Sequence, residues 1–492
     1  MSNVIEEVTL NWTDLTGKKT GASKLGSNKF YKATITDNGG SFTVTFNYGR
    51  VGSAGQTQTV QCGTVDDAKR QMEKKVKAKI SKGYTRVEMR SEDEEKAKAK
   101  AQGVDVGDKK KKKKAKKRSR EFHPQVDGLV RFMYSSTGKA IAKGLSSAAG
   151  ASEDAPLGNL SDAQLDKGAD ILDELEKLAE KKRKPKKDKF IDLTNDYLSN
   201  IPRDIDYARK GGRLDLDQIV IDTQERIDEQ RQFITLLRDA FLQKEVFQKA
   251  AELDDPVEVW YEGLNCDIDA IDDKSDEFAW LDEMFAKGQS PKNGNFYGKL
   301  KLCRAWKLER NGEKDGFDEY AAKIKKKKTS TGIIHGWHGT KDANLMGISK
   351  SGLLMPENLP KGVHITGKAF GMGIYHAPRW PDAGDDRKCE DTGETYKRFN
   401  GALKSMNYTD CAGAYWNSAS SGRKGFMFLE EIALGTPEVH LTACWGKDRP
   451  AKGKDYIYAK AFGNPQLAHD EIVTFEENAQ RMTHLLEIGH KK

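Results

Sequence analysis

The segment from residue 109 to residue 120 constrains the fold of this chain more than any other. It carries ten Lys or Arg side chains and no Asp or Glu. Such a run has no hydrophobic periodicity, and its charges cannot be buried in a core without partners. We therefore expect residues 91–120 to be a disordered basic linker, and the chain to fold as separate parts on either side of it.

The charge of the chain is divided unevenly around this segment. The 492 residues carry a net charge of +8, but the first 120 residues carry +14 and the rest carry −6. A positive first quarter of the chain is suited to a polyanionic partner such as nucleic acid. The mildly acidic remainder must serve another purpose.

Composition excludes several classes of protein. Hydrophobic residues make up 37% of the chain, and no apolar run approaches the eighteen residues that a membrane span needs. Glu6 and Glu7 lie where a signal peptide would be basic and then apolar, so we expect no secretion. The six cysteines form no C-x-x-C pair, so we expect neither a metal site nor a disulfide framework.

The region before the basic segment has the pattern of a small sheet with one helix. Tyr31, Ala33 and Ile35 alternate with polar residues, residues 37–40 supply a turn, and alternation resumes at Phe42. A basic amphipathic stretch follows at residues 66–80. It is either a solvated helix face or a surface that contacts phosphate groups, and charge alone does not decide between them.

The region after the basic segment is helical up to about residue 253. Ser161 and Gln164 form a capping box, and Leu165, Leu172 and Leu175 follow at helical spacing. Ile227 and Ile234 mark a later, longer helix. We interpret these apolar positions as the core of a helical bundle.

From residue 254 onward, aromatic and β-branched clusters alternate with glycines, which is typical of an α+β domain with short strands. The fold class predicted for the whole chain is therefore multidomain α+β. It combines a small β-sheet domain, an all-α helical bundle and a glycine-rich α+β domain. The last of these contains no dinucleotide-binding fingerprint, P-loop or nucleophile elbow.

An ordered set of motifs resembles the poly(ADP-ribose) polymerase family. The motifs similar to its catalytic domain are His338-Gly339-Thr340, Phe370-Gly371-x-Gly373-Ile374-Tyr375, Lys404-Ser405-x-Asn407-Tyr408, and Glu471. Residues 156–161 and 193–202 resemble its autoinhibitory helical domain, and residues 29–87 resemble its WGR domain. This is the order of the short, DNA-damage-dependent members that lack zinc fingers.

The resemblance implies four segments: a WGR-like DNA-binding domain at residues 1–90, the linker at 91–120, a helical regulatory domain at 121–253, and an ADP-ribosyltransferase domain at 254–492. The implied reaction cleaves the bond between nicotinamide and ribose in NAD, which is a substrate, through an oxocarbenium-like transition state. No metal takes part.

The resemblance also assigns roles to individual residues. Glu471 matches the catalytic glutamate, His338 matches the histidine that binds the adenosine ribose, and Tyr375 and Tyr408 would stack on the nicotinamide ring. Catalytic roles are implied for Glu471, His338 and Tyr375. The implied NAD-binding positions are His338, Gly339, Thr340, Gly347, Tyr375, Lys404, Ser405 and Tyr408. In particular, Gly339 would offer its backbone to the carboxamide because it has no side chain to block approach.

In the WGR-like domain, Tyr48 replaces the family's tryptophan and could stack on a nucleotide. Plain packing of Tyr48 on the apolar face of the sheet is the alternative. Arg50 resembles the arginine that couples DNA binding to release of autoinhibition, and Gly49 and Lys82 complete the implied DNA-binding set. The implied partners are damaged DNA and acceptor proteins such as histones and the chain itself, in the nucleus, with no membrane.

Three departures from the family pattern bear on the product. Residues 378–403 form a long insertion between Ala377 and Lys404, only eight residues separate Phe462 from Glu471, and Leu354 replaces a frequent arginine. The short acceptor-side segment puts polymer elongation in doubt. A DNA-break-activated poly-ADP-ribosyltransferase is the leading hypothesis, with a mono-ADP-ribosyltransferase and a catalytically silent DNA-end-binding scaffold as alternatives.

Overall fold

The computed structural model describes most of the chain, with gaps. The described residues are 3–17, 26–89, 120–148, 160–181, 186–211, 213–251, 255–286, 300–359, 369–390, 392–406, 408–411, 424–465 and 467–490. Apart from Arg120, the predicted basic linker lies outside them. The chain divides into two compact units, described in turn below.

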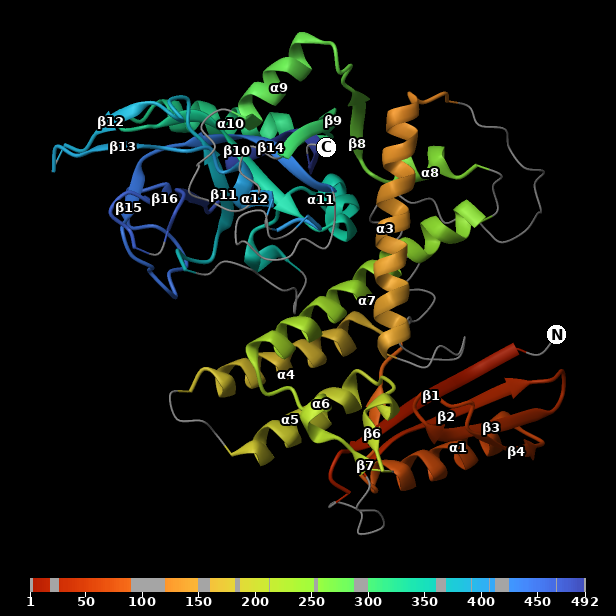
Figure 1. Cartoon of the computed structure of the whole chain (residues 1–492). Coiled ribbons are helices and arrows are strands. Elements are labelled where there is room, and N and C mark those ends of the chain that lie inside the picture. Colours follow the sequence, from red (N-terminus) through yellow and green to blue (C-terminus); the bar gives the residue numbers. More distant parts are fainter. Residues whose placement is uncertain are drawn as a thin grey trace. The chain divides into compact units, whose positions relative to one another are not determined.

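The first unit comprises residues 1–111, 139–245 and 360–364. Its sheet has the strand order β4-β3-β2-β1-β5 (Figure 1). The strands are β1 (Asn3–Asp14), β2 (Ser27–Asp37), β3 (Phe42–Arg50), β4 (Gln56–Cys62) and β5 (Thr85–Val87). The predicted hairpin is β2–β3, and its alternating apolar residues, including Ala33 and Val44, are fully buried.

Helix α1 (Val65–Ile80) covers the apolar face of this sheet with Ala68, Met72 and Val76. Thr64 caps the helix by accepting a hydrogen bond from the Asp67 backbone N–H. The helix confirms the prediction for residues 66–80, whereas strand β1 was not predicted.

The helical part of the first unit contains α4 (Asp162–Ala179), α5 (Lys187–Asn200), α6 (Leu216–Ile219) and most of α7 (Gln224–Ala251). Ser161 caps α4 as predicted, because its Oγ accepts from the Gln164 N–H at 3.1 Å. The reciprocal half of the predicted capping box does not form, because the Ser161 N–H donates to the Glu88 carbonyl and the Gln164 side chain bonds to Glu88 and Asn200. Strand β1 is fixed to α5, where the Asn195 side chain accepts from the Leu15 N–H at 2.8 Å. The helical middle region is thus confirmed. Short elements η2 (Asp206–Ala208), β6 (Arg209–Lys210) and β7 (Arg213–Leu214) precede α6.

The second unit comprises residues 112–138, 246–359 and 365–492. Its nine-stranded mixed sheet has the order β15-β16-β17-β11-β10-β14-β18-β9-β8, with one parallel pair, β15–β16. The strands are β8 (Cys266–Ala270), β9 (Leu300–Arg310), β10 (Gly332–Thr340), β11 (Ile374–Arg379), β14 (Lys424–Leu434), β15 (Pro437–His440), β16 (Tyr456–Ala459), β17 (Glu471–Thr474) and β18 (Gln480–His490).

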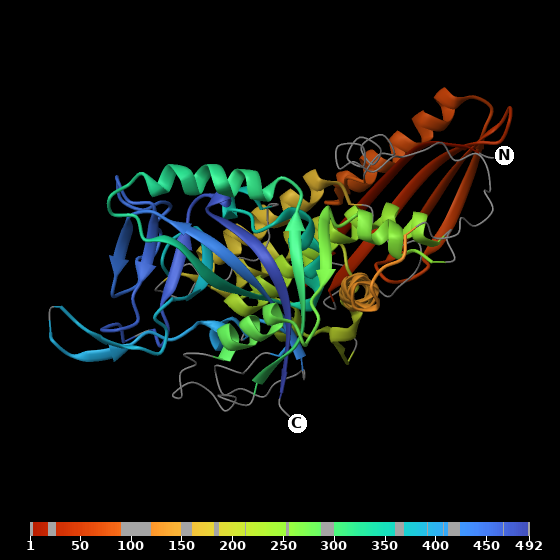
Figure 2. The same cartoon turned by 90° about the horizontal axis from the view of Figure 1, so that it is seen from above.

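Helices cover both faces of this sheet (Figure 2). The first part of α3 (Pro124–Ala148) and α8 (Val257–Glu262) pack on Trp306 and Phe428, while α9 (Asp276–Ala286) and α12 (Ala402–Met406) pack on Met427 and Leu429. Helix α10 (Glu313–Lys325) contacts β9, β10, β14 and β18, and α11 (Leu345–Ser351) follows β10. The multidomain α+β fold class is confirmed.

The two units do not follow the predicted boundaries at residues 121 and 254, because the start of α3 belongs with the second unit. The four-segment division stays a prediction. None of the described helices combines the length and apolar character needed to cross a membrane.

Candidate active site

Neighbouring strands in the middle of the second sheet carry the three predicted catalytic residues. Strand β11, which begins at Ile374-Tyr375, pairs with β17 on one side and β10 on the other. Glu471 is the first residue of β17, and His338 lies near the end of β10. The short helix α12, which carries Lys404 and Ser405, contacts both β10 and β11. The fold therefore gathers residues that are far apart in sequence.

Lys404 and Glu471 form an ion pair at the centre of this site. Their side chains are 9% and 14% exposed, so the pair is largely removed from water. Burial lowers the pKa of the Lys404 ammonium, while the neighbouring Asp470 carboxylate opposes the shift. The contact fixes the Glu471 carboxylate against α12.

His338 lies where β10 and β11 part. The register between these strands ends at the pair Trp337–Ala377, one residue before His338. Burial lowers the pKa of His338, and its imidazole is hydrogen-bonded to the backbone of Tyr375. A neutral imidazole has one donor and one acceptor nitrogen, so His338 can keep this contact and still bind a sugar hydroxyl.

The hydroxyl of Tyr375 is held by the glycine-rich turn before it. It donates to the Gly371 carbonyl at 2.9 Å and accepts from the Phe370 N–H at 2.8 Å. Gly371 has a φ of +101°, which favours glycine. Burial raises the pKa of Tyr375, so its hydroxyl stays protonated and the ring is fixed in place. Tyr408 follows α12 and is 40% exposed.

The structure gives a packing reason for a glycine at position 339, in addition to the predicted contact with the carboxamide. A Cβ atom at Gly339 would lie 1.8 Å from the Ser405 carbonyl oxygen, so the absent side chain admits α12. The Ser405 hydroxyl donates to the Trp337 carbonyl at 3.0 Å. Thr340 is buried and accepts from the Asn344 side chain at 3.2 Å, whereas Gly347 is exposed with open space around it.

The predicted DNA-binding residues lie in the first unit. Tyr48 on β3 stacks on Tyr31 at a ring distance of 5.9 Å, and the Lys79 ammonium lies 5.6 Å from the Tyr48 ring centre. Tyr48 thus makes the packing contacts named as its alternative role. Gly49 approaches Gly55 closely, and Arg50 Nη1 lies 3.4 Å from an Asp206 carboxylate oxygen. Lys82 is exposed after α1.

Two sets of contacts near Glu471 were not predicted, those of Asp470 and those of the insertion at residues 378–403. The buried Asp470 carboxylate accepts three hydrogen bonds, from the Trp380 ring N–H at 2.7 Å, the Tyr458 hydroxyl at 2.9 Å and the Ala461 N–H at 2.8 Å. Its position directly before Glu471 in the sequence carried no signal of this structural role.

The insertion at residues 378–403 contains the hairpin of β12 (Asp386–Lys388) and β13 (Thr395–Lys397). Its Tyr396 ring stacks on Phe462 at 4.3 Å, and the Lys460 ammonium lies over both rings. The insertion therefore contacts the short segment that leads to Glu471.

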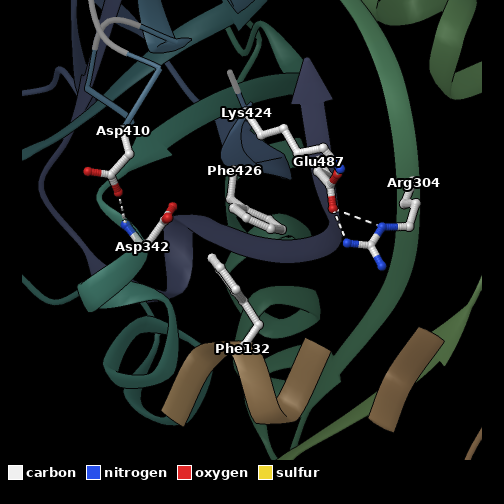
Figure 3. A pocket seen from close by; sticks show the side chains of 7 residues that line it. All are labelled: Phe132, Arg304, Asp342, Asp410, Lys424, Phe426 and Glu487. Atoms are coloured by element: carbon white, nitrogen blue, oxygen red, sulfur yellow. Dashed lines mark hydrogen bonds and ion pairs between the residues drawn. The ribbon is translucent and has the colours of Figure 1, made fainter. Parts of the chain in front are cut away.

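A separate cavity of about 330 Å³ lies beside α3 in the same unit (Figure 3). Phe132 and Phe426 form its apolar wall, and the buried Glu487 pairs with Arg304 and Lys424 at another wall. On the far side, burial and the Asp410 carboxylate raise the pKa of Asp342 to about 7. Asp410 also lines the cavity.

Three family models match the chain. The WGR domain model matches residues 7–92, the model described as "Poly(ADP-ribose) polymerase, regulatory domain" matches residues 120–261, and the poly(ADP-ribose) polymerase catalytic domain model matches residues 275–383. The catalytic match includes His338 and Tyr375 and ends before Lys404 and Glu471.

Curated relatives are distant in sequence. Poly [ADP-ribose] polymerase 2-A of Oryza sativa is 23% identical over 65% of this chain and 41% of its own length. Protein mono-ADP-ribosyltransferase PARP3 of Mus musculus is 24% identical over 90% of this chain and 76% of its own length. Poly [ADP-ribose] polymerase 1 of Gallus gallus is 27% identical over 45% and 20%. The chain spans only about two fifths of the rice, maize and Arabidopsis polymerase 2 proteins that it matches.

The matched domains and the order of the site residues lead to one conclusion. This chain belongs to the poly(ADP-ribose) polymerase family, with a WGR domain, the family's regulatory domain and the family's catalytic domain.

Proposed function

We propose that this chain is a DNA-break-activated enzyme of the nucleus that transfers ADP-ribose from NAD to proteins, including itself, and extends it into a polymer. The observation that carries the proposal is the buried ion pair between Lys404 and Glu471 of β17, the strand that pairs with the Tyr375 strand β11. The catalytic domain match supports the choice of NAD as substrate.

The reaction breaks the bond between C1 of the ribose and the nicotinamide nitrogen, and nicotinamide leaves with the bonding electrons. An acceptor oxygen or nitrogen then bonds to C1 and loses a proton. The carbon passes through a state with cationic character, so a fixed carboxylate favours it over the ground state. Glu471 is suited to this role because Lys404 holds it in place.

The other site residues would bind and orient NAD. Tyr375 presents a ring whose hydroxyl is already held by the glycine-rich turn, so stacking would not require it to rearrange. His338 can hold a ribose hydroxyl through its second ring nitrogen. We also propose Gly339, Thr340, Gly347, Ser405 and Tyr408 as NAD-binding positions.

Damaged DNA is the proposed activator. The WGR domain match and the net charge of +14 on the first 120 residues support a DNA-binding role, and Tyr48, Gly49, Arg50 and Lys82 are the proposed contacts. A growing ADP-ribose chain is also a polyanion, so its accumulation would compete for the same basic surface and release the enzyme.

A mono-ADP-ribosyltransferase is the second candidate. The connection from β16 to Glu471 is short, and the insertion hairpin packs against it through Tyr396. The mouse relative that aligns over 90% of this chain is named a mono-ADP-ribosyltransferase.

The test uses the full chain with labelled NAD, with and without nicked duplex DNA. We expect nicotinamide release that increases with nicked DNA, and a ladder of modified protein on a gel. Discrete bands on the gel would favour the mono-ADP-ribosyltransferase. Nicotinamide release that is the same with and without nicked DNA would overturn the proposed activation by DNA. No nicotinamide release in either condition would leave the DNA-end-binding scaffold as the remaining alternative.

A further inference from the structure

Behind the proposed site lies a buried acid–base pair that the reaction described above does not use. His376 Nδ1 lies 2.6 Å from Glu430 Oε2, and both side chains are completely buried. His376 directly follows Tyr375 on β11, and Glu430 lies on β14. These two strands are not neighbours, because β10 runs between them.

The pair crosses β10 at a glycine. On one side Gly336 is opposite Glu430 of β14. On the other side it is opposite Pro378 of β11, two residues along the strand from His376. A Cβ atom at Gly336 would come within 2.4 Å of Ile432 and 3.6 Å of the His376 side chain. The missing side chain at Gly336 therefore leaves room for Ile432 beside the pair.

The hydrogen bonds continue from His376 to β17. His376 Nε2 lies 3.0 Å from the Thr474 hydroxyl, which lies 2.8 Å from Gln480 Oε1, and Gln480 Nε2 donates to the Glu477 carbonyl at 2.8 Å. The single Thr474 proton goes to Gln480 Oε1, which cannot donate, so His376 Nε2 must donate to Thr474. One more proton is then shared between His376 Nδ1 and Glu430.

This chain of contacts joins the strands that carry the site. Thr474 is three residues from Glu471 in β17, and His376 is next to Tyr375 in β11. Alternation along β10 and β11 also puts His338 on the same face as His376. Glu430 and His376 both act electrostatically on His338, in opposite directions, and Glu430 Oε1 is buried without a hydrogen-bond partner.

Stability alone does not explain such a pair, because apolar residues of similar volume usually stabilise a core as well as a buried ion pair does. We propose that His376 and Glu430 are positioning residues for ADP-ribosyl transfer. They tie β11 and β17 to β14 across Gly336, and so hold Tyr375, Glu471 and His338 in the arrangement that the reaction needs. This inference rests on the proposed function.

The test compares single and double variants of the full chain. His376→Phe and Glu430→Met each leave one buried polar group without its partner, so we expect each to lower the melting temperature. The double variant removes both groups, and we expect its melting temperature to return to within a few degrees of wild type. Its kcat for nicotinamide release should stay at least about tenfold below wild type, with KM for NAD within about threefold.

Two further variants complete the design. Glu431→Gln is the matched control, because Glu431 is the next residue of β14 and pairs with Arg481 instead; we expect wild-type kcat. If the double variant does not fold, Thr474→Val removes the hydroxyl that joins His376 to β17 and to Gln480 but keeps the His376–Glu430 pair, and we expect a lower kcat from a folded protein. Recovery of kcat together with melting temperature in the double variant, or wild-type kcat in Thr474→Val, would overturn the proposal.

Hydrogen exchange separates this inference from the proposed function. We expect the amides of residues 471–474 and 374–377 to exchange faster in the double variant than in wild type or Glu431→Gln, whether or not the protein releases nicotinamide. An inactive wild type would refute the proposed function alone. Unchanged exchange at these amides would refute the positioning role.

Discussion

Polar residues of the catalytic sheet and those of the WGR domain are in opposite environments. Lys404, Glu471, His376 and Glu430 have side chains that are at most 14% exposed, and each has a partner in contact. The side chain of Arg50 in the WGR domain is 54% exposed, and its ion pair with Asp206 spans 3.4 Å. A single change in the first group leaves a buried partner unpaired and so affects stability as well as chemistry, whereas changes in the second can alter a partner's binding with little effect on the fold.

The largest effect is expected from Glu471→Gln, which keeps the shape of the side chain and removes its charge. The carbon that develops positive charge would lose its fixed carboxylate, so we expect nicotinamide release to fall by about a hundredfold or more. Release from NAD in the presence of nicked DNA is the measurement. Glu476→Gln is the control, because the Glu476 side chain is 61% exposed and lies just after the same strand; it should keep wild-type release.

A smaller effect, and one on stability, is expected from Asp470→Asn. Three donors point at this carboxylate, and an amide group would turn at least one N–H toward them. We expect the free energy of unfolding to fall by about 2–3 kcal/mol, the range for a buried charged acceptor that loses its partners. Urea unfolding of the isolated variant protein would measure it. An unchanged midpoint would mean that the Asp470 contacts contribute nothing net, and the contrast with Glu471 would fail.

The sequence predicted the parts of this arrangement that depend on local patterns. The alternation at Ala33 and Val44 predicted the first hairpin, and Ser161 with Gln164 predicted the start of α4. The resemblance named Lys404 and Glu471 as site positions without indicating their ion pair. Residue spacing carries such information because it reflects the period of a strand, the geometry of a cap or the order of a family's motifs.

The sequence could not predict contacts that depend on strand order. His376 and Glu430 are 54 residues apart and meet because the sheet order puts their strands, β11 and β14, on either side of β10. The stacking of Tyr396 on Phe462 likewise depends on how the insertion hairpin folds back. Single residues of these types occur throughout the chain, so nothing in their spacing distinguishes them before the sheet order is known.

Asp342, at the wall of the cavity, is neither fully buried nor fully exposed, and its contribution to stability should depend on pH. Its pKa in the folded state is about 7, above its ordinary value, so between about pH 4 and 7 the folded state binds more protons than the unfolded state. Stability should therefore fall as the pH rises through this range. Because Asp342 is only partly buried, we expect a loss of about 1–2 kcal/mol.

Asp342→Asn is the variant that tests this shift. The variant should lose the part of the pH dependence of stability between pH 5 and pH 8 that comes from Asp342. At pH 8 it should unfold at a higher urea concentration than wild type. A wild type and variant with parallel pH profiles would contradict the raised pKa.

The smallest effect on stability is expected from Arg50→Ala, and it is the one that most sharpens the comparison. The Arg50–Asp206 pair is exposed, so its loss should cost at most about 1 kcal/mol. It nevertheless joins the WGR sheet to the helical region within one compact unit. If Arg50 transmits DNA binding, the stimulation of nicotinamide release by nicked DNA should drop several-fold while the melting temperature moves by only a few degrees. Arg70→Ala, on the exposed side of α1, removes a similar charge whose 3.6 Å pair with Asp67 stays within one helix, and should keep the stimulation. Equal losses in both variants would show that net charge, and not the Arg50 contact, couples DNA to the catalytic domain.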